Sequence, residues 1–253
     1  MSWHHQFFVR PNLVRRLKAA ARKLGFDVVA LSANDVEPHY FEINDRVEQY
    51  TMTSLSRVFA VIAAAEHLSR RSVQGAVVEC GVWKGGSTMA ALLALARIKD
   101  ISREVWLYDT YEGMAAPTRQ DGDTHTQLFT TYLRADGGSD WCRAELGEVV
   151  TNVESCGYPM AKIKFIKGRV EDTIPGNLPD RISLLRLDTD WYESTKHELD
   201  HLYPRLVSGG ILIIDDYGAF AGAKQAVDEY FASQKINTFL HRIDTTGRLL
   251  VKA

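Results

Sequence analysis

From residue 76 onward, short runs of β-branched and other apolar residues alternate with helical segments. The expected strands cover 76–80, 104–108, 162–166, 182–188 and 210–215, and the expected helices cover 87–98, 141–156, 191–206 and 219–233. This alternation is typical of βαβ units around a parallel sheet. Near the end of the chain, 236–243 and 248–251 flank an Asp-Thr-Thr-Gly turn and predict an antiparallel hairpin. The chain therefore predicts an α/β fold, with a mostly parallel sheet of seven strands that ends in an antiparallel pair.

The N-terminal part of the chain is predicted to be helical. Apolar residues recur at helical spacing over 12–24, with Gly25 as the expected C-cap, and again over 46–71. The basic residues of the first helix could face a membrane or a partner, but a solvated face on a packed helix is the commoner arrangement. We therefore expect residues 1–75 to form a helical extension that serves as a lid or as an oligomer interface.

Composition excludes several classes of protein. The formal charge of −2 and the pI near 6.5 give no excess of positive charge that would favour binding of nucleic acid. No apolar stretch approaches the roughly 20 residues of a membrane span, and the N-terminus does not resemble a secretory signal, so we expect a cytoplasmic protein. Cys80, Cys142 and Cys156 form no CxxC pair, which argues for reduced thiols rather than a disulfide framework or a zinc site.

A glycine-rich turn at 81–88 follows the first expected strand and opens the next helix. Glycine there lets a ligand approach the backbone at a helix N-terminus. The spacing is not G-x-G-x-x-G, so a ligand with a diphosphate is disfavoured. Asp109 ends the next strand, where an acidic side chain usually accepts hydrogen bonds from ribose hydroxyls. Together the two features predict a nucleoside ligand, with Asp109 as a plain strand-end turn residue as the alternative.

Two further apolar runs end on acids. One ends at Asp188 and the other at Asp215 and Asp216, so three carboxylates are expected at one edge of the sheet. Such a cluster calls for a cation, and carboxylate oxygens suit Mg²⁺, Mn²⁺ or Ca²⁺ better than zinc, with Mg²⁺ as the cellular default. The alternative is that these aspartates cap turns or helices. Asp190 is left out of the metal shell, because residues 190–193 have the form of a capping box for the helix expected at 191.

These motifs together resemble the class I S-adenosylmethionine-dependent methyltransferases, and most closely the metal-dependent macrocin O-methyltransferase family. The resemblance covers roughly residues 46–253 and rests on 79–87, 109–113, 167–173, 187–192 and 214–217. It implies a Rossmann-like sheet, a S-adenosylmethionine-binding catalytic domain over 76–253, and methyl transfer to sugar hydroxyls of macrolides and related natural products.

The resemblance also implies roles for individual residues. The expected cofactor-binding residues are Glu79, Gly81, Trp83 and Ser87 around the methionine part, Asp109 at the ribose, and Gly168 with Glu171 or Asp172 at the adenine edge. Gly85 and Thr110 are also expected to bind the cofactor. Catechol O-methyltransferase, a more distant relative, supports a metal site on Asp188, Asp215 and Asp216, with Asp188 also catalytic.

The general base must differ from that of the catechol enzyme. The catechol enzyme has a catalytic lysine three residues beyond its first metal aspartate, and Trp191 stands there in this chain. Residues 111–140 are expected to form a loop or insertion over the site, and His125 within it could act as a base near neutral pH. The alternative is an ordinary polar loop histidine.

The resulting functional prediction is a Mg²⁺-assisted O-methyltransferase that acts on a sugar or polyol hydroxyl of a natural product or glycan. The expected partners are S-adenosylmethionine, Mg²⁺ or Mn²⁺, a small hydroxylated and glycosylated acceptor, and further copies of the chain in a homo-oligomer. Two alternatives are a noncatalytic S-adenosylmethionine-binding module and a nicotinamide-dependent oxidoreductase, the latter disfavoured by the missing G-x-G-x-x-G.

Overall fold

The computed structural model describes Ala20 and residues 36–253, apart from the side chains of residues 123–125. The chain divides into two compact units, Met1–Pro38 and His39–Ala253, and the second contains the whole sheet. The helix predicted over 12–24 lies outside the described residues except for Ala20. The predicted role of residues 1–75 as a lid or an interface stays a prediction.

The sheet has seven strands in the order β3-β2-β1-β4-β5-β7-β6. Their bounds are β1 (Ala76–Cys80), β2 (Val105–Asp109), β3 (Ile163–Lys167), β4 (Ile182–Leu187), β5 (Leu206–Ile214), β6 (His241–Arg242) and β7 (Arg248–Val251). The first five are parallel, and β7 is antiparallel to both β5 and β6. The predicted fold class is therefore confirmed. The strand order reverses between β1 and β4, which is where open α/β sheets bind ligands.

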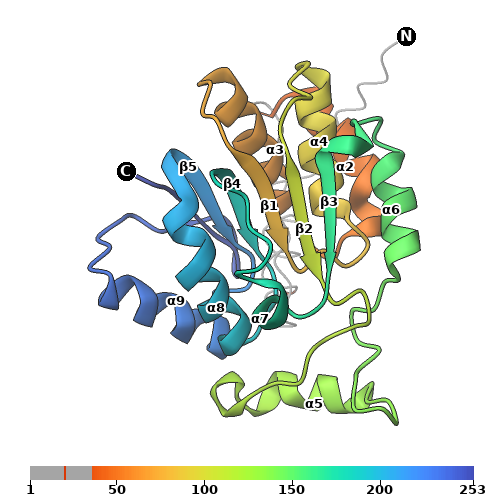
Figure 1. The fold of residues 1–253 in the computed structure, drawn as a ribbon, viewed down its shortest axis with the longest axis vertical. Helices are drawn as coiled ribbons and strands as arrows, with labels where there is room; N and C mark the ends of the chain where they lie inside the picture. Colours follow the sequence, from red (N-terminus) through yellow and green to blue (C-terminus); the bar gives the residue numbers. More distant parts are fainter. Residues whose placement is uncertain (1–19, 21–35) are drawn as a thin grey trace. The chain divides into compact units, whose positions relative to one another are not determined.

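Helices cover both faces of the sheet (Figure 1). One core contains residues of α2 (Pro38–Val47), α3 (Leu55–Arg70), α4 (Gly86–Arg97) and α6 (Leu146–Glu154), and the other contains residues of α7 (Val170–Thr173), α8 (Tyr192–Leu202) and α9 (Ala221–Ser233). In β1, Val77 packs into the first core, whereas Val78 and Cys80 pack into the second. Burial on both faces explains why these strands are continuous apolar runs in the sequence.

The single helix predicted over 46–71 is wrong. The structure has the end of α2, a 3-10 turn at η1 (Glu48–Tyr50), an extended break, and then α3 from Leu55. Ser54 is the N-cap of α3, and its Oγ accepts a hydrogen bond from the backbone N–H of Arg57 at 3.3 Å. Ser54 thus satisfies a free N–H group in the first turn of α3. This cap fixes the start of α3 as a separate helix after the break.

Other predicted helices are confirmed with different ends. The span predicted at 141–156 contains the shorter α6, and the span predicted at 191–206 is α8 followed by η4 (Tyr203–Arg205), where Pro204 favours the tighter 3-10 turn. A short 3-10 turn, η3 (Met160–Lys162), precedes β3. Among the described residues, no helix is both long and apolar enough to cross a bilayer.

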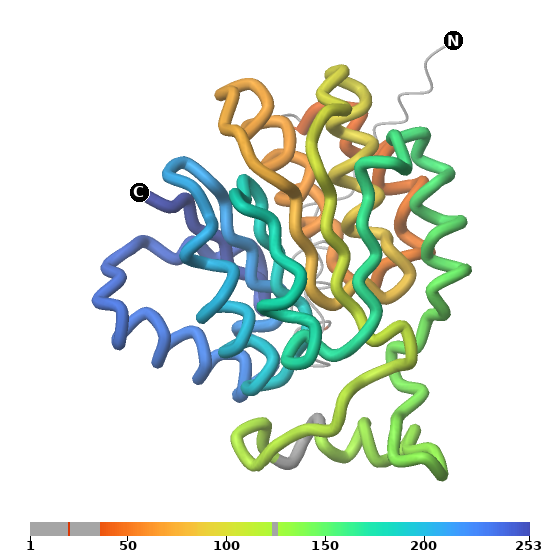
Figure 2. The backbone as a smooth tube through the Cα atoms, viewed as in Figure 1, coloured from red at the N-terminus to blue at the C-terminus, as the bar shows by residue number. Residues whose placement is uncertain are grey.

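The segment 111–140 is an insertion that leaves the sheet after β2 and returns before α6, as the tube in Figure 2 traces. It is not a plain loop, because it contains η2 (Arg119–Asp121) and α5 (Asp123–Thr131). In Figure 1, α5 lies beyond the carboxyl ends of β1, β2 and β3. The insertion therefore stands on the ligand-binding side of the sheet.

Candidate active site

A cavity of about 270 Å³ opens at the carboxyl ends of β1, β2, β4 and β5. Strand-end residues line its floor, among them Gly81, Asp109, Asp188 and Asp215. The cavity is also lined by residues 50–53, which precede α3, and by Arg57 in the first turn of α3. Residues 113–115 of the insertion and residues 141–142, which follow it, line the cavity too. The cavity thus lies at the reversal of strand order, where the sequence motifs were expected to converge.

The glycine turn is fixed by the close approach of β1 and β4. Gly81 has a φ of +81°, and a Cβ on it would lie 2.0 Å from the carbonyl oxygen of Asp188, so only glycine fits. The turn is also tied to β2, because Oδ2 of Asp109 accepts hydrogen bonds from the backbone N–H groups of Val82 (2.7 Å) and Trp83 (3.0 Å). The candidate cofactor turn and the first metal aspartate are therefore held in one arrangement.

Asp109 has the turn role that was considered as the alternative to ribose binding. Its Oδ1 accepts a hydrogen bond from the backbone N–H of Tyr111 at 2.7 Å, so it does organise the strand-end turn. It also lines the cavity. Burial raises the pKa of Asp109, and the backbone N–H donors oppose that rise. Oδ1 also accepts from the Thr110 hydroxyl at 3.4 Å, so each oxygen already has two donors and a ribose hydroxyl would have to displace one of them. The ribose contact stays a prediction.

Seven of the ten expected cofactor-binding residues line the cavity. They are Gly81, Trp83, Ser87, Asp109, Thr110, Gly168 and Glu171. The other three do not line it. Glu79 is 3% exposed and binds the guanidinium of Arg186 and the hydroxyl of Thr88. Gly85 is the N-cap of α4 and faces Val149 and Val153, and Asp172 is exposed on α7.

The three predicted metal aspartates do come together. Asp188, after β4, and Asp215 and Asp216, after β5, each present a carboxylate oxygen within 4.8 Å of the other two. Burial and the neighbouring carboxylates raise the pKa of Asp188 well above its usual value and that of Asp216 to about 8. This hard, all-oxygen donor set fits a Mg²⁺ or Mn²⁺ ion, which would relieve the repulsion among the carboxylates.

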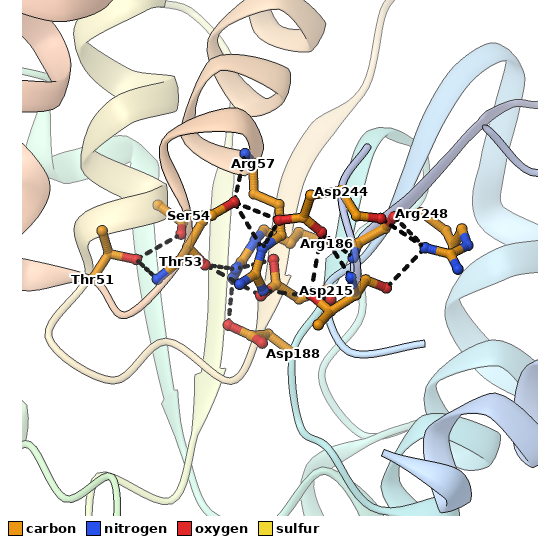
Figure 3. Close-up of polar contacts among 12 residues, drawn as sticks. Thr51, Thr53, Ser54, Arg57, Arg186, Asp188, Asp215, Asp244 and Arg248 are labelled. Atoms are coloured by element: carbon orange, nitrogen blue, oxygen red, sulfur yellow. Dashed lines mark hydrogen bonds and ion pairs between the residues drawn. The ribbon is translucent and has the colours of Figure 1, made fainter. Parts of the chain in front are cut away.

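Two arginines that were not predicted from the sequence contact Asp188 and Asp215 (Figure 3). Arg186, in β4, is 4% exposed and donates to Glu79 (2.5 Å), Asp188 (2.7 Å) and Asp215 (2.6 Å). Arg57, in the first turn of α3, pairs with the other oxygen of Asp215. The aspartates are therefore partly balanced by cations of the chain itself. The sequence contained one signal for this, because an arginine in a strand buried on both faces must be paired.

The capping box predicted at 190–193 is wrong. The N-cap of α8 is Trp191, with no capping side chain of its own. Instead, Oδ1 of the buried Asp121, from η2 in the insertion, accepts the backbone N–H of Tyr192 at 2.7 Å. Asp190 is thereby free for another role: it lines the cavity with a φ of +68°, and its carboxyl group is hydrogen-bonded to that of Asp216.

An apolar wall stands beside the carboxylates. The rings of Trp141, Trp191 and Phe220 pack together with centroid separations of 5.7 to 6.4 Å. Trp191 also donates its indole N–H to the carbonyl of Ala115 at 2.8 Å, which fastens the insertion to the loop that follows β4. Trp191 thus fills the lysine position of the catechol enzyme with a structural side chain. His125, the predicted base, lies on α5, and its side chain falls outside the described residues.

Comparison with known proteins identifies the family. Residues 23–252 match the family described as Macrocin-O-methyltransferase (TylF). The chain belongs to this macrocin O-methyltransferase family. It is therefore an S-adenosylmethionine-dependent O-methyltransferase.

Individual members are similar over most of their length. A protein of Streptomyces olivaceus named 8-demethyl-8-(2,3-dimethoxy-alpha-L-rhamnosyl)-tetracenomycin-C 4'-O-methyltransferase is 35% identical over 198 residues, which cover 78% of this chain and 74% of the relative. Demethyldecarbamoylnovobiocin O-methyltransferase of Streptomyces niveus is 32% identical over 200 residues, with 78% and 74% covered. Among solved structures, the O-methyltransferase NovP is 30% identical, with a TM-score of 0.70 over 81% of this chain and 82% of NovP.

Proposed function

We propose that this O-methyltransferase transfers the methyl group of S-adenosylmethionine to a sugar or polyol hydroxyl of a glycosylated natural product or glycan, with the assistance of Mg²⁺ or Mn²⁺. The observation that supports it is the position of Asp188, Asp215 and Asp216 in the same cavity as the glycine turn. A carboxylate cluster beside a cofactor site is what an enzyme needs to hold an acceptor oxygen close to the sulfonium methyl group.

The cofactor-binding part of the site is built from the ends of β1, β2 and β3. Gly81, Trp83 and Ser87 would surround the methionine part of the cofactor, and Asp109 would accept the ribose hydroxyls. Glu171 would lie at the adenine edge, where its carboxylate is already held by the Ser194 hydroxyl at 2.7 Å. These contacts bind the donor and orient its methyl group without forming a bond to it.

The metal-binding part of the site is built from the ends of β4 and β5. Asp188, Asp215 and Asp216 would hold the cation, which supplies charge that lowers the pKa of an acceptor hydroxyl and orients its oxygen. Asp190 is the described carboxylate best placed to take the proton of that hydroxyl, because it lines the cavity and contacts Asp216 but lies outside the predicted metal set. His125 stays the alternative base from the sequence.

The acceptor-binding part of the site is built from the insertion and the aromatic wall. Trp141 is half-buried and lines the cavity, where its ring would pack against the C–H face of a sugar. The names of the two relatives above refer to methylation of a rhamnosyl-tetracenomycin and of demethyldecarbamoylnovobiocin. Both point to a natural product as the class of acceptor. We also propose that the enzyme resides in the cytoplasm and acts as a homo-oligomer.

The test is a turnover assay with the purified full chain, S-adenosylmethionine, Mg²⁺ and a panel of glycosylated and non-glycosylated hydroxylated acceptors. Release of S-adenosylhomocysteine should depend on a glycosylated acceptor, and mass spectrometry should find one added methyl group on its sugar. Methylation confined to an aglycone would contradict the acceptor assignment. Cofactor binding without turnover on any acceptor would return the noncatalytic module as the better account.

A further inference from the structure

Both oxygens of Asp215 are already engaged by arginines, and the two arginines differ in their freedom to move (Figure 3). Oδ1 accepts from Arg186, whose guanidinium is buried and also binds Glu79, Asp188 and the hydroxyl of Thr53. Oδ2 pairs with Arg57. Oδ2 also accepts from the Thr53 hydroxyl, so a cation that takes this oxygen as a ligand must displace one of its two donors. Arg186 stays in place, because its loss would leave the buried carboxylates of Glu79, Asp188 and Asp215 without their shared cation.

Arg57 has a second anionic partner. Its Nε lies 3.1 Å from Oδ2 of Asp244, in the turn between β6 and β7. Asp244 itself is fixed, because its Oδ1 accepts the backbone N–H groups of Thr246 (2.9 Å) and Gly247 (2.7 Å). Oδ2 also accepts from the hydroxyl of Ser54, the cap of α3. Arg57 contacts both carboxylates at once, so it can give up Asp215 to a metal and remain paired with the fixed Asp244.

We propose that Arg57 is a positioning residue that competes with the divalent cation for Asp215 and keeps Asp244 as its only carboxylate partner when the cation binds. The proposal rests on the metal site of the proposed function. Until the cation arrives, Arg57 neutralises Asp215 and holds it facing the cavity. Once the cation is bound, the Arg57–Asp244 pair keeps a positive charge away from the ligand shell.

The exchange also links the metal to one wall of the acceptor cavity. Arg57 and Thr53 both line the cavity, and the Thr53 hydroxyl donates to the same Oδ2 of Asp215 at 3.2 Å. A change in the partners of Asp215 therefore alters the contacts of the residues in the break between α2 and α3. The C-terminal hairpin takes part in this exchange through Asp244, the second partner of Arg57, although the turn between its strands does not line the cavity.

The test measures Mn²⁺ affinity by calorimetric titration of the full chain, without turnover. Arg57→Gln should bind Mn²⁺ about tenfold or more tightly than wild type, because a competing unit charge is removed from contact with a ligand. Asp244→Asn should bind more weakly, by about fivefold, because Arg57 then has only Asp215 as its anionic partner. Arg71→Gln is the matched control, since it removes the same charge from an exposed position at the C-terminal end of α3, and its affinity should equal that of wild type.

Arg57→Lys retains the charge and should bind Mn²⁺ nearly as wild type does. The proposal is overturned if Arg57→Gln binds Mn²⁺ with unchanged or weaker affinity while its thermal unfolding matches that of wild type. Should Arg57→Gln fail to fold, an unchanged affinity in Asp244→Asn overturns it instead. A wild-type chain that binds no Mn²⁺ removes the metal site itself together with this proposal, so the two failures are distinguishable.

Discussion

Glu198 of α8 is expected to be a neutral acid in the folded protein. It is 0% exposed, its Oε2 accepts the hydroxyl of Thr189 at 3.2 Å, and its Oε1 has no hydrogen-bond partner among the described residues. Burial raises its pKa well above the usual value, and nearby Glu171 and Asp188 raise it further. The other buried glutamates, Glu66 and Glu79, both pair with an arginine, whereas the described residues offer none to Glu198.

A raised pKa in the folded state makes stability fall as pH rises. Between the unfolded pKa of about 4.3 and the raised folded pKa, the native state holds a proton that the unfolded state has lost. Each pH unit in that window costs the wild type about 1.4 kcal/mol relative to a variant that cannot ionise there. Glu198→Gln is such a variant, and its oxygen can keep the Thr189 hydrogen bond.

The measurement is the free energy of unfolding by urea, for wild type and Glu198→Gln, at several pH values from 5.5 to 7.5. The difference should move in favour of the variant as pH rises, at up to about 1.4 kcal/mol per pH unit while the pH stays below the folded pKa. Glu193→Gln, on the exposed side of the same helix, should show no such trend. A difference between Glu198→Gln and wild type that stays constant with pH would show that Glu198 titrates alike in both states, which would refute the reasoning.

Two further predictions concern the active site. Asp109→Ala should weaken S-adenosylmethionine binding about tenfold or more in a calorimetric titration, because it loses both the ribose contact and the brace of the glycine turn, and an unchanged dissociation constant would remove Asp109 from the site. Asp190→Asn should lower turnover about 100-fold or more while cofactor affinity is retained, if Asp190 is the base, and in that case His125→Ala should lose less than a few-fold. The reverse pattern between pH 6 and 9 would assign the base to His125.

The sheet was predictable because its determinants are local. Strands buried on both faces are apolar runs of their own, and the acids at their ends must meet at one edge whatever the details of packing. For that reason the Asp188, Asp215 and Asp216 cluster could be predicted from strand ends alone.

The contacts around that cluster were less predictable because they join distant parts of the chain. Asp121 caps α8 from 71 residues away, and Arg57 reaches Asp215 across 158 residues, so neither pairing leaves a spacing to detect. The capping box at 190–193 was mispredicted because a residue from the insertion performs the capping instead. Local signals did exist for the break before α3, in Ser54 with its cap geometry, and for Arg186, as a charge within an apolar strand.

Methyl transfer by this enzyme is proposed to require a divalent cation held by Asp188, Asp215 and Asp216. The most direct measurement is turnover, followed as S-adenosylhomocysteine release, before and after exhaustive chelation with EDTA, with S-adenosylmethionine affinity titrated on the same samples. Chelation should abolish turnover and leave cofactor binding intact, and added Mg²⁺ or Mn²⁺ should restore the rate. Full wild-type turnover in the metal-free enzyme would contradict the account, and the three aspartates would then be strand-end groups balanced by Arg57 and Arg186 alone.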